Sequence, residues 1–72
     1  MTRNKILHDT AMFYLDKKTS VHITLESNTW LNGMIVEVKE DRLILIDEKF
    51  GEMLIIFDRI KDDGIEPREE KR

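Results

Sequence analysis

The apolar residues near the start of the chain recur at helical spacing. They lie three or four positions apart and so share one face of an α-helix: Leu7, Ala11, Tyr14 and Leu15. Thr2 or Asn4 can cap the first turn. Lys17 and Lys18 fall in the last turn, where cations complement the helix dipole. The pattern predicts a helix over about residues 4–18.

After Ser20 the period changes from that of a helix to two. Val21, Ile23 and Leu25 alternate with polar residues, as in a strand half buried against a core. A turn at residues 27–28 leads into a long β-rich run, Thr29 to Val38, which contains Gly33. A glycine inside a strand is typical of a bulge or a sharp bend in the sheet.

Two later runs are apolar at consecutive positions and therefore on both faces of a strand. They are Leu43–Asp47 and the stretch Met53–Phe57, each preceded by a polar turn. A solvated antiparallel sheet needs only one apolar face, so either the helix or a second subunit should cover the other. A short fifth strand follows from Ile60 to Ile65, interrupted by Asp62–Gly64 and ended by Pro67.

These elements predict a mostly β protein, with an N-terminal α-helix followed by a strongly bent, five-stranded antiparallel small barrel. One domain spans residues 1–67, with its strands over about residues 20–66. Residues 68–72 are expected to form a charged, flexible tail.

Composition turns attention to association with other chains. A chain of 72 residues has a thin core, and small domains make up the shortfall with disulfides, metals or association. There is no cysteine, and neither His8 nor His22 has a ligand partner at metal-binding spacing, so no metal or other cofactor is expected. No apolar run is long enough to cross a membrane, and we expect a cytoplasmic protein with no membrane partner.

The chain resembles the Sm-like family, which includes Sm and LSm proteins and bacterial Hfq. The likeness extends over about residues 5–67 and rests on the element order and on two motifs, "VHITLESNTWLNGMIVEV" and "GEMLIIFDRIKDDGIEP". The resemblance implies a bent barrel that forms a homo-oligomeric ring of five to eight subunits, in which the fourth strand of one subunit pairs with the fifth of the next. It also implies binding of single-stranded RNA.

The sequence departs from the family at the positions that bind bases. Asp41 and Leu43 stand where the family has an aromatic residue or histidine and an asparagine, and residues 56–58 replace the family's Arg-Gly or Lys-His. The resemblance therefore implies the barrel and the ring, but not the usual uridine pocket.

Cations and flat side chains are what single-stranded RNA binding requires. The candidates are Arg42, Arg59, Asp41, Phe57, Lys5, Lys17, Lys18 and Trp30. Each has an alternative: the arginines pair with Asp41 and Asp58 across neighbouring loops, Phe57 is core, the lysines form a solvated helix face, and Trp30 packs on the helix or on a neighbouring subunit. Candidate subunit contacts are Leu54, Ile56, Ile60 and Ile65.

Three functions remain open. The first is an Sm-like ring that binds single-stranded RNA as a chaperone or scaffold. The second is a homo-oligomeric structural or protein-assembly module with little or no RNA binding, which the net charge of −3 favours. A monomeric peptide-binding barrel of the Tudor or chromo type ranks third. No nucleophile motif or phosphate loop is present, so neither an enzyme nor a small-molecule substrate is expected.

Overall fold

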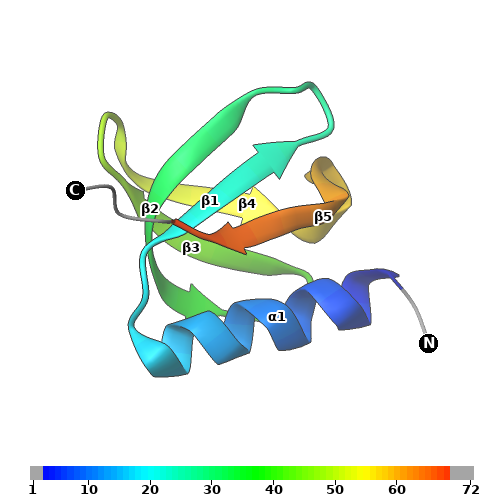
Figure 1. Cartoon of the computed structure of the whole chain (residues 1–72). Coiled ribbons are helices and arrows are strands. Elements are labelled where there is room, and N and C mark those ends of the chain that lie inside the picture. The colour runs from blue at the N-terminus through cyan, green and yellow to red at the C-terminus, as the bar shows by residue number, and fades with distance from the viewer. Residues whose placement is uncertain (1–2, 69–72) are drawn as a thin grey trace.

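The chain folds into a curled sheet with a helix across one end. The structure is a computed structural model that describes residues 3–68. Its elements are α1 (Arg3–Lys17), β1 (Val21–Leu25), β2 (Trp30–Val38), β3 (Arg42–Asp47), β4 (Gly51–Ile56), the 3-10 turn η1 (Phe57–Arg59) and β5 (Ile60–Pro67). Figure 1 shows α1 below the sheet and the tip of the β1–β2 hairpin on the opposite side. The predicted order of one helix and five antiparallel strands is confirmed.

Helix α1 begins one residue earlier than predicted, at Arg3. Asn4 therefore lies inside the first turn and does not cap the helix. Its side-chain amide donates instead to Asp58 Oδ1, over 3.1 Å. Thr2, the other predicted cap, lies outside the described residues.

The strands form one antiparallel sheet in the order β4-β3-β2-β1-β5. Gly33 is the residue of β2 that pairs on both sides, with Val21 of β1 and with Asp47 of β3. A Cβ atom at this position would overlap the carbonyl oxygen of Ile46. The glycine therefore permits a close backbone approach, while the register shift of β2 occurs farther along, between Ile35 and Glu37.

The interruption predicted in the fifth strand appears as a bulge in its pairing with β1. Ile65 lies opposite Ile23, and Ile60 lies opposite Leu25, so residues 61–64 of β5 face a single residue of β1. Gly64 belongs to this bulge, and a Cβ atom there would come too close to the carbonyl oxygen of Thr24. The bulge pushes a charged segment out from the sheet edge.

The core fills the inside of the curled sheet. Helix α1 contributes Leu7 and Ala11, and all five strands and η1 contribute the remaining buried residues: Val21, Ile23, Leu31, Ile35, Leu43, Leu45, Ile55, Phe57, Ile60 and Ile65. The helix packs mainly against β2, β5 and η1. The outward side chains of β3 and β4 stay uncovered, since Ile46, Leu54 and Ile56 are exposed.

The last described residue contacts two other segments of the chain. Arg68, which the sequence placed in the tail, donates its backbone N–H to the carbonyl oxygen of Ser20 over 2.9 Å. Its guanidinium also pairs with Glu48. The rest of the predicted tail, residues 69–72, lies outside the described residues. Within residues 3–68, no helix has the length and apolar character needed to cross a membrane.

Candidate functional site

The start of the helix meets two turns of the barrel. One is the turn between β2 and β3, and the other is η1; the backbone N–H of Phe57 in η1 donates to the carbonyl oxygen of Asp41 over 2.9 Å. Four RNA-binding candidates lie on or directly beside these two turns, which the structure brings together: Asp41, Arg42, Phe57 and Arg59.

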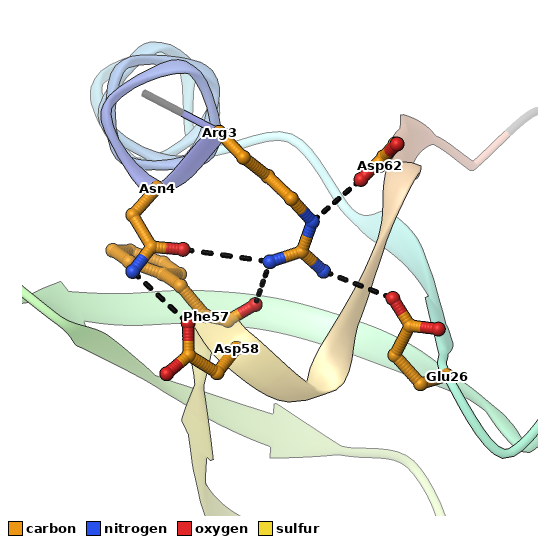
Figure 2. Close-up of polar contacts among 6 residues, drawn as sticks. All are labelled: Arg3, Asn4, Glu26, Phe57, Asp58 and Asp62. Carbon is orange, nitrogen blue, oxygen red and sulfur yellow. Dashed lines mark hydrogen bonds and ion pairs between the residues drawn. The ribbon is translucent and has the colours of Figure 1, made fainter. Parts of the chain in front are cut away.

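Arg3 connects the helix to three other segments of the chain: η1, the turn after β1 and β5. Its Nη1 donates to the carbonyl oxygen of Phe57 over 3.3 Å, its Nη2 to Glu26 Oε2 over 3.1 Å, and its Nε to Asp62 Oδ1 over 2.5 Å. Figure 2 shows the guanidinium between these three acceptors, with Asn4 reaching Asp58 beside it. We call this arrangement the Arg3 clamp.

The two candidate arginines differ in their surroundings. Arg42 donates from Nε to Asp41 Oδ1, its neighbour in the same turn, over 3.0 Å, whereas the alternative predicted from the sequence was a pairing across neighbouring loops. The Arg59 side chain has no hydrogen-bond or ion-pair partner among residues 3–68, and the carboxylate of Asp58 is taken by Asn4 instead. Arg59 is thus the guanidinium of the pair that remains available.

Phe57 is completely buried, so its ring cannot stack on a base in this structure. The 3-10 turn η1 directs the chain so that the ring enters the core. Its edge is covered by His8 of the helix, with the ring centroids 6.2 Å apart. The alternative that Phe57 serves as core is the one the structure favours.

The candidate lysines of the helix lie at its two ends. Lys5 pairs with Asp9 over 3.1 Å, and this contact is the main reason why the pKa of Asp9 lies below its usual range. Lys17 lies over the Phe13 ring, 5.6 Å from its centroid. Because a helix rises about 1.5 Å per residue, Lys17 and Lys18 lie roughly 20 Å from the turns that carry Arg42 and Arg59. Lys17 and Lys18 therefore do not form one basic patch with the arginines, whereas Lys5 lines a surface hollow together with Asp41.

Trp30 is more than half exposed, at 58%, on the outer surface of the β1–β2 pair. Its ring lies 5.4 Å from that of His22, and the planes are tilted by 31°. His22 Nδ1 is also 2.8 Å from Asn32 Oδ1, so the imidazole is held from two sides. Beside this group is a surface hollow lined by His22, Asn32, Glu66, Pro67 and Arg68. The ring lies on the outside of the sheet and not against the helix, so base stacking and packing on a neighbouring subunit stay as predictions for Trp30.

The candidate subunit contacts fall into two classes. Leu54 and Ile56 are 54% and 42% exposed on β4, an edge strand of the sheet. Ile60 and Ile65 of β5 are buried, so their side chains pack in the chain's own core and cannot contact a neighbour. What β5 can offer to another chain is its open backbone edge.

An apolar groove runs along β4. Its lining comes from β1, β2 and β4: Leu25, Leu31, Met53, Leu54, Ile55 and Ile56. Arg59 contributes a charged side chain to the same groove. The sequence indicated the apolar residues of β4 but not the contribution of Leu25 and Leu31, because the curl of the sheet brings them alongside.

Within residues 3–68, no three His, Asp or Glu side chains are arranged to hold a metal ion. Comparison of the chain with protein-family models and with curated proteins gives no match.

Proposed function

We propose that this chain is an Sm-like subunit that assembles with copies of itself into a closed ring, by joining β4 of one copy to β5 of the next. The observation that carries this proposal is the sheet order β4-β3-β2-β1-β5, which leaves both strands as open edges, with Leu54 and Ile56 exposed on β4. An open edge strand with exposed apolar side chains pairs readily with another strand.

The difference between the two edges favours a ring over a simple dimer. A twofold dimer requires a self-complementary surface, whereas joining two unlike edges makes a head-to-tail contact that closes into a ring or continues as a filament. Closure removes every free edge. It also supplies the cover that the outward apolar side chains of β3 and β4 lack in the single chain.

Size-exclusion chromatography with light scattering tests the ring. We expect the wild-type chain to elute as an oligomer at micromolar concentration, and Leu54→Asp or Ile56→Asp to elute as a folded monomer. Val36→Asp is a matched control, because Val36 is 51% exposed on β2, a central strand, and its change should leave the oligomer intact. A monomeric wild type would refute the proposal.

Single-stranded RNA binding is the second candidate function. It is favoured by the exposed Trp30 beside His22; the adjoining hollow also includes Arg68, whose guanidinium would have to exchange Glu48 for a phosphate. Aromatic rings stack on unpaired bases and cations contact the phosphates, and a ring would repeat both groups in every copy, which raises avidity. This places the candidate RNA surface on the β1–β2 pair, away from the buried Phe57.

The chain has one tryptophan, so its fluorescence reports on this surface directly. Titration with oligo-U and oligo-A should quench Trp30 emission, and the affinity should fall steeply as salt rises. Trp30→Ala should weaken binding about tenfold or more, as expected for the loss of a base-stacking contact. Phe50→Ala, which removes an exposed aromatic ring from the turn between β3 and β4, should have no effect. If neither RNA binds at low salt, the ring serves assembly without RNA.

A further inference from the structure

The groove along β4 has a composition that points to its occupant. Six of its lining side chains are apolar, and the charged one is Arg59, whose guanidinium has no hydrogen-bond or ion-pair partner among residues 3–68. A guanidinium at the border of an apolar groove gains most from a carboxylate, because that pair would be partly desolvated. The groove therefore fits a segment that brings both a strand edge and a negative charge.

The opposite edge of the same chain carries such a segment. Residues 61–64 bulge from β5, and Asp63 is exposed there without a side-chain partner among the described residues. Its neighbour Asp62 is already held by Arg3. Glu66, farther along the strand, is likewise exposed and unpaired within residues 3–68.

The direction of pairing selects between the two carboxylates. Every strand pair of the sheet is antiparallel. If β4 and the incoming β5 continue this pattern, the C-terminal end of β4, next to Arg59, lies opposite the N-terminal half of β5, where Asp63 lies. A parallel arrangement would place Glu66 closer to Arg59 instead.

We propose that the groove is occupied by β5 of a second copy, and that an ion pair from Arg59 to Asp63 of that copy fixes the direction of assembly. This inference rests on the proposed ring and adds the charge pair that makes the two edges specific for each other. Opposite charges at such a contact favour the correct register, and like charges oppose it strongly.

Charge reversal on each side tests the pair. Arg59→Glu alone and Asp63→Lys alone should each weaken assembly by at least about tenfold, because like charges then face each other. An equimolar mixture of the two variants should recover the oligomer where the subunit number is even, so that the variants alternate. At one contact the introduced glutamate of the first variant meets the introduced lysine of the second, and at the next the two native side chains, Arg59 and Asp63, meet. The double variant Arg59→Glu/Asp63→Lys, which restores an opposite-charge pair at every contact, should recover the oligomer for any subunit number. Both positions are exposed, so the variants should stay folded, and recovery on mixing would itself exclude misfolding.

Glu66→Lys is the matched control, with the same kind of change on the same strand. Mixing Glu66→Lys with Arg59→Glu should leave assembly weakened; recovery by this mixture would overturn the Arg59–Asp63 pair. The pair would also be overturned if both single variants assembled as well as the wild type, or if the double variant Arg59→Glu/Asp63→Lys failed to recover assembly. These three outcomes leave the ring itself standing. A monomeric wild type, in contrast, refutes the ring and the ion pair together.

Discussion

Asp47 shows how one buried carboxylate shapes the turn between β3 and β4. Its Oδ2 accepts from the backbone N–H groups of Lys49 and Phe50 over 2.8 and 2.9 Å, and its Oδ1 accepts from that of Asn32 over 3.2 Å. These hydrogen bonds hold the pKa of Asp47 below its usual range, and the bond from Phe50 has the largest effect. Burial of the carboxylate acts in the opposite direction and raises the pKa. The carboxylate satisfies donors that the tight turn would otherwise leave unpaired.

Asp47→Asn should lower the melting temperature by about 5 °C or more near neutral pH, because the amide replaces one acceptor oxygen with a donor. The folded pKa of Asp47 lies below that of the unfolded chain, so the stabilisation is present above the unfolded value and is lost as pH falls through the folded one. The gap between variant and wild type should thus be constant above about pH 5 and shrink below about pH 4.

Thermal denaturation followed by circular dichroism across pH 2–7 measures this gap. Asp16→Asn, at an exposed helix position, is the control and should follow the wild type throughout. A gap between Asp47→Asn and wild type that stays the same at every pH would contradict the role given to the ionised carboxylate.

Single residues were the hardest features to predict from the sequence. Asp47 reads as the polar end of an apolar strand, and nothing in the local pattern shows that three backbone donors surround it. Phe57 is the last residue of an apolar run, so the pattern does not show on which face of the sheet its ring lies. The 3-10 turn η1 directs the ring into the core. Lys49 and Phe50 are neighbours of Asp47 in its turn, but the third donor, Asn32, and the surroundings of the Phe57 ring belong to segments distant in the sequence.

At the scale of elements, the Arg3 clamp joins parts of the chain that the sequence leaves far apart. Arg3 and Asp62 are separated by 59 positions, yet their contact helps to fix the start of α1 against β5 and η1. The ion pairs are partly exposed, so each contributes only modestly to stability. The clamp is better understood as positioning the helix and η1 than as a main source of folding free energy.

Arg3→Gln should reduce the free energy of unfolding by about 1 kcal/mol, because exposed ion pairs and one hydrogen bond are lost. Amide hydrogen exchange should increase in η1 and in the first turn of α1, since these segments lose their shared anchor. Lys17→Gln, at the far end of the helix, should leave exchange in η1 unchanged.

Urea denaturation and hydrogen exchange together test the clamp. In about 1 M salt the difference between Arg3→Gln and wild type should become smaller, because screening weakens the ion pairs. Unchanged exchange in η1 would show that the clamp does not hold this turn.

The elements themselves were largely predictable, for physical reasons. Leu7 and Ala11 repeat at helical spacing, so a helix buries both on one face. Val21 and Ile23 alternate with polar residues, so a strand buries both on one face. Gly33 marks a real backbone constraint. The clamp and the contribution of Leu25 to the β4 groove were beyond reach, because both arise from the way the sheet curls.

At the scale of the whole molecule, two open edges and a small core lead to the same conclusion. A domain of 72 residues buries a limited share of its surface, and this one leaves Ile46, Leu54 and Ile56 of adjoining strands exposed. Pairing the edges between copies would bury apolar surface and satisfy backbone groups in one step. Assembly should therefore contribute to folding stability as well as to function.

This coupling predicts that the melting temperature of the wild-type chain rises with protein concentration. Mass action favours the folded oligomer over unfolded single chains as concentration increases, whereas the unfolding of a monomer is independent of concentration.

Leu54→Asp should melt at a lower temperature than the wild type, and this temperature should be the same at every concentration, because the variant does not assemble. The variant should still fold, because Leu54 is exposed in the single chain and its change costs the monomer little. Val36→Asp should keep the concentration dependence of the wild type. Calorimetry over about a hundredfold range of concentration separates these cases. A wild-type melting temperature that is constant and equal to that of Leu54→Asp would mean that the edges of the sheet stay unpaired in solution.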